Sequence, residues 1–584
     1  MPLSTLLQRL SPFKRWSLLA LSIGIVSGLG SILFTLMLRV STDFFLRTIV
    51  NYYPPAPGGE LEIPNPGIDP QLLFLPIVTT IGGLISGVLV YVWAPEAEGH
   101  GTDAVIDAFH NLRGKIRKRI PIIKTLSSVA IIGSGGSAGR EGPIAQIGAG
   151  FGSWVTSFLH LSERDRRIAV ICGAAGGIGS IFKAPLGGAI FSIEVLYHRD
   201  FEAEALVPSF ISSMVAYSIY APFAGFQSIF DTPYFAFLSI ESLVFYAILG
   251  MLAAPLARFY VKFFYGLRDL FARIKISNIF KPAIGGLLLG SIGIFMPEIL
   301  GPGYGWLQMA MEGKLMILFM LILIGAKILA TSLTISSGGS GGVFAPSLFI
   351  GGMLGGAFGE IAVKLFPNID MNPGAFVLVG MAAFFSGAAK VPIASIIMVS
   401  EMTGDYFILP PLMLACTLSY LFSGEESIYE NQVPTKADSP VHRGKFTIDL
   451  LEKIRVRMVM TTNVITVSPD DTVYKVSRLI GETGHLGYPV LDGDKLVGMV
   501  TYADVIRVPV SKAENTKVRE IMSTRLVYVN PEDRLNDALR KMHECKHGHL
   551  PVVDIEDPKK LLGIITKSDL VRGHEVIRRV INAE

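Results

Sequence analysis

Charged residues are scarce in this chain. Only 17% of its 584 residues are Asp, Glu, Lys or Arg, against about a quarter in soluble domains. The scarcity is confined to residues 1 to about 425, where long apolar runs are broken by Gly and Pro, whereas the tail from about 430 onward has an ordinary soluble composition. The first part of the chain therefore cannot be a soluble globular domain.

Cysteine and net charge are also low. The three cysteines, Cys172, Cys416 and Cys545, are too few and too scattered for a disulfide framework or a zinc ribbon. The formal net charge of +3 is small, which argues against nucleic acid as a partner.

Long apolar runs are present instead. Residues 76–94 and 315–335 are each long enough to cross a bilayer core of about 30 Å. The sequence thus predicts a multi-pass protein of the cell membrane, with the lipid bilayer as its surroundings. Several basic residues would mark a cytoplasmic face: Lys14, Arg15, those of residues 113–119, Arg164, Arg166 and Arg167. We expect the N- and C-termini to lie on this cytoplasmic side.

The tail contains a repeat at an offset of 62, in which MVMTTNVITVSPDD (458–471) matches EIMSTRLVYVNPED (520–533). Each copy reads as strand, helix, strand, strand, helix. Such an α/β unit needs its neighbour to cover its sheet, so the copies should form a pair.

The membrane part contains a second repeat. SGGSAGREGPIAQIGAG (134–150) aligns with SGGSGGVFAPSLFIGGM (337–353) at an offset of 203, and residues 173–194 align with 380–401. Gly/Pro-interrupted segments at corresponding places in two halves predict inverted repeats whose broken helices meet at a site in mid-membrane. Packing of helices through small residues is the alternative, and it accounts best for GGLISG (82–87) and GGMLGG (351–356).

Two half-helices that begin at the same depth offer backbone N–H groups and the positive ends of their dipoles, so a small anion is the expected guest. Glu141 lies at one of these starts. Ionised, its carboxylate can occupy the anion site; protonated, it can leave and admit the substrate. The alternative is a surface pair of Arg140 and Glu141 at a helix cap, but adjacent residues do not face each other on a helix.

These motifs resemble the CLC family of chloride channels and chloride/proton exchangers. The resemblance is carried by GREGP (139–143), GGVFAP (341–346), KAPLGGAIFSIE (183–194) and EMTGDY (401–406). It implies a homodimeric, all-α membrane protein with a pore in each subunit, a transporter rather than an enzyme, with chloride or a similar anion and protons as its partners.

The resemblance also implies roles for single residues. Glu141 would be the external gating glutamate. Tyr429, in GEESIY (424–429), would donate its hydroxyl to the central anion, although a tyrosine at a membrane edge is the plainer interpretation. The remaining anion ligands would be backbone N–H groups, of Val343 and Phe344 at the central site and of Arg140 to Gly142 at the outer one.

Two departures from the family pattern matter. In PEAEGHGTD (95–103), His100 replaces the usual serine and Asp103 the usual proline. His100 could hold the anion, more strongly when protonated; equally, it could turn away and cap the helix, with Asp103 at the N-cap. Both interpretations stay open.

The second departure is Val195, which stands where exchangers commonly carry an inner proton-relaying glutamate. Glu194 is a poor substitute, because Glu401 occupies the equivalent position of the other repeat, which indicates a shared structural role. Chloride/proton antiport is the preferred prediction, and a passive gated channel is the alternative.

The tail resembles a pair of CBS (cystathionine-β-synthase-type) domains, which commonly bind adenine nucleotides. ATP, ADP or AMP would then modulate transport, while the membrane part requires no cofactor. Asp504 and Asp569 stand where the family often contacts the ribose hydroxyls, with Thr501 and Thr566 nearby; helix N-capping explains the same residues.

HECKH (543–547) matches the HExxH pattern of zinc proteases, so a CBS-containing membrane metallohydrolase is the remote alternative. The motif needs a third ligand, and GETGH (481–485) in the other repeat does not preserve it, so no metal site is predicted. The predicted parts are a transport domain at 1–430, a cytoplasmic linker at 431–454, and cytoplasmic CBS repeats at 455–510 and 511–584.

Overall fold

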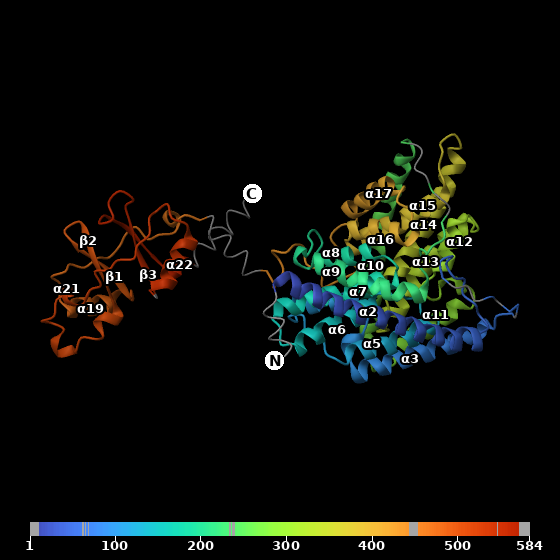
Figure 1. The fold of residues 1–584 in the computed structure, drawn as a ribbon, viewed down its shortest axis with the longest axis horizontal. Helices are drawn as coiled ribbons and strands as arrows, with labels where there is room; N and C mark the ends of the chain where they lie inside the picture. Colours follow the sequence, from blue (N-terminus) through green and yellow to red (C-terminus); the bar gives the residue numbers. More distant parts are fainter. Residues whose placement is uncertain are drawn as a thin grey trace. The chain divides into compact units, whose positions relative to one another are not determined.

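The structure is a computed structural model of the full chain. It describes residues 11–60, 64, 66–67, 69–232, 235, 240–442, 454–545 and 547–570. The chain divides into two compact units, Met1–Val441 and His442–Glu584 (Figure 1). Much of the predicted linker lies outside the described residues.

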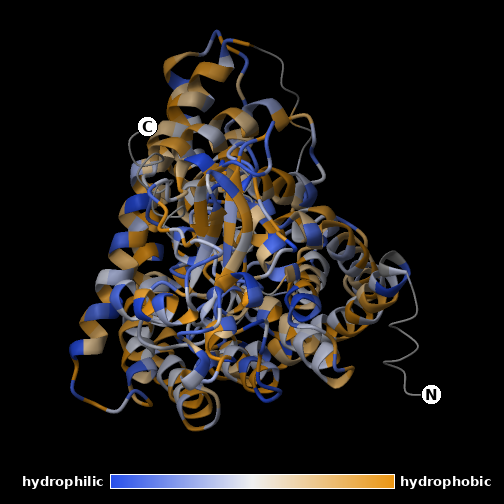
Figure 2. Cartoon of the chain, turned by 90° about the vertical axis from the view of Figure 1, so that its left-hand side faces the viewer, coloured by the Kyte–Doolittle hydropathy of each residue, from blue (hydrophilic) through white to orange (hydrophobic). Residues whose placement is uncertain are grey.

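The first unit is built from helices throughout its described residues, and apolar residues predominate along them (Figure 2). Among the residues that the structure describes, six segments are long and apolar enough to cross a membrane; they include α2, α3, α10, α13 and α14. The first-half helices are α2 (Pro12–Thr42), α3 (Leu75–Trp93), α4 (Thr102–His110), α5 (Ile120–Gly133), α6 (Glu141–Phe158), α7 (Glu163–Ile181), α8 (Pro185–Glu194) and α9 (Leu206–Ala224). The second-half helices are α10 (Ser242–Arg273), α11 (Lys281–Gly293), α12 (Tyr304–Met311), α13 (Ile317–Ile335), α14 (Phe344–Leu365), α15 (Pro373–Ala389), α16 (Pro392–Thr403) and α17 (Leu409–Phe422). Short helical turns are the π-helical η1 (Asp43–Ile49) and the 3₁₀ turns η2 (Leu72–Phe74), η3 (Pro95–Ala97), η4 (Ala203–Ala205) and η5 (Pro297–Ile299).

The two halves repeat one plan of close helix packing. A Cβ on Gly148 would lie 2.1 Å from the carbonyl oxygen of Gly173, so only glycine lets α6 and α7 approach this closely. In the second half, a Cβ on Gly351 would lie 2.3 Å from the oxygen of Gly380, between α14 and α15. The small-residue packing predicted for GGMLGG (351–356) is confirmed.

Buried lysines repeat as well. Lys124 Nζ donates to the carbonyls of Ala97 (3.0 Å) and Gly99 (2.7 Å), at the turn after η3. Lys327, 203 positions later, donates in the same way at the turn after η5, at 2.9 and 2.7 Å. Each ammonium satisfies carbonyls that no helix uses, and it thereby fixes the turn that leads into α4 or α12.

The second unit contains two α/β repeats. The first has α19 (Val473–Thr483), the antiparallel pair β1 (Gly487–Asp492) and β2 (Lys495–Thr501), and α20 (Tyr502–Val505). The second has α22 (Leu535–Cys545) and the antiparallel pair β3 (His549–Val553) and β4 (Leu561–Thr566). The short turn η6 (Val456–Met458) precedes α19, and η7 (Val510–Lys512) and α21 (Val518–Ile521) lie between α20 and α22.

The predicted first strand of each repeat is only partly formed. It is reduced to a single parallel bridge, Val467 with Val490 in one repeat and Val529 with Val552 in the other. Val467 and Val529, which belong to the predicted strands, are both buried, as the apolar pattern predicts. The prolines and turns that flank each bridge prevent further ladder hydrogen bonds, so a longer strand does not form.

Candidate functional site

Three helix starts, those of α4, α6 and α14, meet inside the first unit. The loops before α6 and α14 pair through Gly139 and Gly342, whose N–H groups each donate to the other's carbonyl at 2.7 Å. These glycines are 203 positions apart, so equivalent points of the two repeats lie against each other. The start of α4 joins them, since a Cβ on Gly142 would lie 1.8 Å from the His100 carbonyl oxygen. The predicted meeting of broken helices is confirmed.

Glu141, the first residue of α6, places its carboxylate between the paired glycines. A Cβ on Gly139 or Gly342 would lie 1.8 or 2.6 Å from its Oε2 atom. The side chain is only 3% exposed, and Tyr304, at the start of α12, donates its hydroxyl to Oε1 at 2.7 Å. Within the described part of the chain, Oε2 has no hydrogen-bond partner. The carboxylate thus occupies the place where two helix dipoles favour an anion.

Arg140 points away from Glu141. Its guanidinium forms an ion pair with Glu60, from the loop between η1 and η2, and lies over the ring of Tyr304 at 5.6 Å. Arg140 is 8% exposed. The alternative of an exposed Arg140–Glu141 pair at a helix cap is therefore wrong: both residues are buried, and the arginine has another partner.

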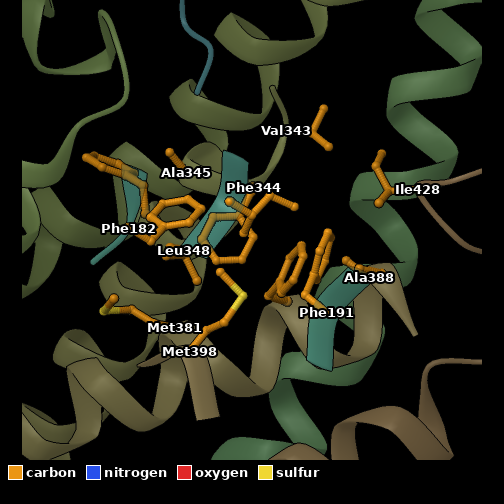
Figure 3. Close-up of a cluster of buried hydrophobic side chains, with 14 of the residues drawn as sticks. Phe182, Phe191, Val343, Phe344, Ala345, Leu348, Met381, Ala388, Met398 and Ile428 are labelled. Atoms are coloured by element: carbon orange, nitrogen blue, oxygen red, sulfur yellow. The ribbon is translucent and has the colours of Figure 1, made fainter. Parts of the chain in front are cut away.

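The start of α14 forms the other wall of the site. Val343 is the N-cap and Phe344 the first helical residue, so the first N–H groups of this helix have no acceptor within it. The ring of Phe344 lies 4.8 Å from that of Phe182 and 4.4 Å from that of Phe385, inside an apolar cluster (Figure 3). This cluster keeps water from the helix start on one side and strengthens electrostatic interactions there.

Tyr429 is 2% exposed, so the interpretation as a membrane-edge tyrosine is wrong. Its ring lies 5.4 Å from the imidazole of His100. The backbone before it is held by Tyr265, whose hydroxyl donates to the Ile428 carbonyl at 2.7 Å. Tyr429 thus lies beside His100, which directly precedes Gly101, the N-cap of α4.

Asp103 fastens the backbone after Tyr429. Its carboxylate accepts from the backbone N–H (2.9 Å) and the side-chain amide (2.6 Å) of Asn431. The N-cap of α4 is Gly101, with a φ of 68° and no side-chain cap bond. The interpretation of Asp103 as the N-cap is therefore wrong. His100 faces Tyr429, and its Nδ1 has no hydrogen-bond partner among the described residues.

Glu194 and Glu401 each accept hydrogen bonds from the start of the helix that carries the other glutamate. The Glu194 carboxylate accepts from the N–H groups of Ile393 (3.1 Å) and Ala394 (2.7 Å), at the start of α16. Glu401 accepts from the first N–H groups of α8, at 3.2 and 2.6 Å. The shared structural role predicted for the two glutamates is confirmed: each caps the other's helix.

Val195, at the C-cap of α8, is buried, and its carbonyl accepts from Gln432 Nε2 at 2.9 Å. A buried acid that sequence reasoning missed lies close along the chain. Glu202 is 2% exposed; its N–H donates to the Ile193 carbonyl at 3.0 Å, and Tyr197 donates its hydroxyl to the carboxylate at 2.8 Å. In the sequence Glu202 is one of several acids in a charged stretch, and only the fold distinguishes it.

The second unit holds a cavity of about 380 Å³ between its two repeats. Thr566 and Asp569 line it, together with His485 and His549, whereas Thr501 and Asp504 do not. Burial lowers the pKa of His549, which favours the neutral imidazole. Of the two predicted nucleotide pairs, Thr566 and Asp569 thus line this cavity, and Thr501 and Asp504 do not.

Both Thr–Asp pairs form helix caps. Thr501 and Asp504 make a capping box at the start of α20, and the Asp569 carboxylate accepts from the Thr566 N–H (2.9 Å) and hydroxyl (2.7 Å). The capping interpretation is confirmed for both.

The HExxH match does not have the geometry of a metal site. Helix α22 ends at Cys545, so His543 lies on the helix and His547 follows its end. Among the described residues, no group of three or more His, Cys, Asp or Glu could hold a metal ion.

Comparison with known proteins identifies the family. The profile of the voltage gated chloride channel family matches residues 82–424, and that of the CBS domain matches 456–511 and 518–574. The chain therefore belongs to the voltage-gated chloride channel (CLC) family, whose members are transporters and channels, and it carries a C-terminal CBS pair.

Individual relatives agree with this assignment. The chain is 31% identical over 372 residues (62% of this chain, 86% of the relative) to a putative ClcB-like chloride channel protein of Ralstonia nicotianae. It is 32% identical over 368 residues (60% and 77%) to the H(+)/Cl(-) exchange transporter ClcA of Klebsiella pneumoniae.

Solved structures share the fold. The crystal structure of a slow cyanobacterial Cl−/H+ antiporter matches with a TM-score of 0.64 at 22% identity, over 72% of this chain and 97% of the other. That of a eukaryotic CLC transporter matches with a TM-score of 0.58 at 19% identity, over 95% and 98%.

Proposed function

We propose that this protein exchanges chloride for protons across a cell membrane, with Glu141 as the gate. The observation that carries the proposal is the position of its carboxylate between Gly139 and Gly342, at two helix starts. A carboxylate in that place mimics the transported anion and must leave before the anion can pass. Exchange transporters among the relatives support the coupling to protons.

The chloride ligands in this proposal come from the residues around the junction. Backbone N–H groups of Val343 and Phe344 and the hydroxyl of Tyr429 hold the central anion; those of Arg140 to Gly142 hold the outer one. Such neutral donors bind a halide without the full charge that would trap it. His100, beside Tyr429 and with an unpaired Nδ1 among the described residues, adds a further donor to the central anion.

On the other side of the site, the proposed proton acceptor is Glu202. Val195 cannot titrate, and Glu194 is committed to the N–H groups of α16. Glu202 is buried, bonded to Tyr197, and 3.8 Å from the ammonium of Lys436. A buried carboxylate that lies beside a hydroxyl and an ammonium group, both of which carry protons, can take up and release a proton.

A passive chloride channel is the second candidate function. The observation in its favour is Val195, an apolar buried residue at the position where exchangers commonly have an acid. In that case Glu141 gates the pore, and no proton crosses with chloride.

Two further features belong to the proposal. The protein forms a homodimer through α8, α16 and α17, which expose large apolar side chains: Leu186, Ile393, Met413, Leu421 and Phe422. The CBS pair lies in the cytoplasm with both termini and binds an adenine nucleotide in the 380 Å³ cavity, with Asp569 on the ribose hydroxyls.

The test uses purified protein in liposomes loaded with chloride, with chloride efflux and internal pH recorded together. Uphill proton movement driven by the chloride gradient is the expected result. Glu141→Gln should abolish proton movement while chloride still flows. Glu202→Gln should slow proton movement at least about tenfold with chloride flux retained. Chloride efflux without proton movement in the wild type would select the channel, and absence of anion flux would refute both.

A further inference from the structure

A second positively charged cavity lies beside the gate. It has a volume of about 280 Å³ and is lined by α2, η1, the loop of residues 54–60 and the turn before α12. Four cations line it, and Glu60 is the one acid among the described residues that do so. The lining cations are Arg39, Arg47, Arg140 and Lys183.

Glu60 is delivered into this cavity by a fixed backbone. The Gly59 N–H donates to the Ile229 carbonyl at 2.9 Å, and Lys183 Nζ donates to the Gly59 carbonyl at 3.1 Å. A Cβ on Gly59 would lie 1.6 Å from the Ser228 carbonyl oxygen, so only glycine fits at this position of the loop. The Glu60 carboxylate is thereby held against the guanidinium of Arg140.

Carboxylates do not satisfy all the donors of these cations, although Glu60 pairs with Arg140 and Asp43 pairs with Arg47. Within the described residues, the Nε atoms of both Arg140 and Arg47 are buried without a hydrogen-bond partner. A guanidinium has five N–H donors, and unsatisfied buried donors cost free energy that a bound anion would recover. The volume also accommodates a halide with several water molecules.

We propose that this cavity is an additional binding site for a monovalent anion, distinct from the central and outer sites at the junction, in which Glu60 competes with the anion for Arg140. Arg140 adjoins Glu141 in the chain, and Tyr304 contacts both side chains, so an anion held here waits one step outside the gate. Two carboxylates then stand in series along one path, each in the place of an anion. The inference extends the proposed function, because it takes the same class of anion as the cargo.

The test exploits Trp306, which lines the cavity. Trp16, Trp93 and Trp154 are replaced by Phe, so that Trp306 is the one remaining tryptophan, and it is excited selectively at wavelengths that tyrosine does not absorb. Iodide, a monovalent anion that quenches tryptophan on contact, is titrated into the full-length protein in detergent. Acrylamide, a neutral quencher, reports any change in the exposure of the indole.

In this background Glu60→Gln should lower the iodide concentration for half-maximal quenching about tenfold, because it removes the competing charge. Arg140→Met should abolish the saturable part. Glu298→Gln is the matched control: it removes an acid outside the cavity lining and should leave the titration unchanged.

If iodide quenching is equal in Glu60→Gln and its parent, and acrylamide quenching is unchanged, the proposed anion site in this cavity is wrong. The result does not depend on transport. Saturable quenching in a protein without anion flux in liposomes would uphold the site and refute the proposed function. Normal flux without saturable quenching would refute the site and leave the proposed function standing.

Discussion

The hydroxyl of Tyr304 is the one side-chain donor that holds the Glu141 carboxylate among the described contacts. A hydrogen bond to a carboxylate favours its ionised form and is worth about 1.5–3 kcal/mol. In the proposed mechanism Tyr304 would hold the Glu141 carboxylate in the anion site, and the strength of this interaction can be measured.

Tyr304→Phe should therefore open the gate at higher pH. With the donor gone, the ionised carboxylate loses its stabilisation, and chloride flux should reach half of its maximum about one pH unit higher. Flux from liposomes measured between pH 4 and 8 gives the shift. Tyr246→Phe, a buried tyrosine stacked on Phe376 at 4.2 Å, is the control, and an equal shift in both variants would contradict this role of Tyr304.

At the scale of single contacts, Asp103 positions Tyr429 through Asn431. Asp103→Asn should weaken chloride binding about three- to tenfold, because the loop that carries Tyr429 loses its charged acceptor. The exchanged pair, Asp103→Asn with Asn431→Asp, restores a carboxylate to the contact and should recover part of the affinity. Isothermal titration with chloride measures both, and normal affinity in the single variant would remove the positioning role.

Among the helices, the reciprocal caps of α8 and α16 are the clearest consequence of the repeat. Each carboxylate satisfies N–H groups at the start of the partner helix. We therefore expect the glutamates to stabilise the fold rather than to carry protons.

Glu194→Gln and Glu401→Gln should each lower the free energy of unfolding by about 1 kcal/mol, the usual value of a helix cap. The ratio of protons to chloride should stay that of the wild type. Thermal unfolding of the protein in detergent and the paired flux assay measure these two quantities. Loss of proton movement in Glu194→Gln without loss of stability would make Glu194 the inner acceptor in place of Glu202.

The two CBS repeats differ in which Thr–Asp pair faces the cavity. Asp569→Asn should therefore weaken adenine-nucleotide binding at least about tenfold, because a charged acceptor for the ribose hydroxyls is lost. Asp504→Asn removes the equivalent carboxylate of the other repeat and should not change binding. Fluorescent ATP titrated into the full-length protein measures both, and equal losses would contradict the assignment of the site.

Over the whole molecule, the features set by local pattern could be predicted from the sequence. The offset of 203, read from glycines, serines and prolines, correctly predicted that the broken helices of the two repeats meet, with Glu141 at one of their starts. The family, the helical class and the CBS pair follow from motifs of the same kind. Such features survive in a sequence because each depends on a residue type that the backbone demands.

Contacts between distant segments could not be predicted in this way. Glu60 meets Arg140 across 80 positions of chain, and Tyr304 meets Glu141 across 163. Nothing in a loop such as YYPPAPGGE distinguishes an acid that enters a cavity from one in solvent. Asp103 was misassigned for the same reason: its partner, Asn431, is 328 positions away.

The pairing of Gly139 with Gly342 has one more consequence. The residues two positions further on, Glu141 and Phe344, are equivalent in the two repeats, and the backbone treats them alike. The carboxylate is present in only one half, and a phenyl ring fills the other. If the junction were formed by two identical half-length chains in opposite orientations, it would be symmetric. It would then have an acid on both sides or on neither side. The two sides of the junction are therefore chemically different, with an acid on one side and a phenyl ring on the other.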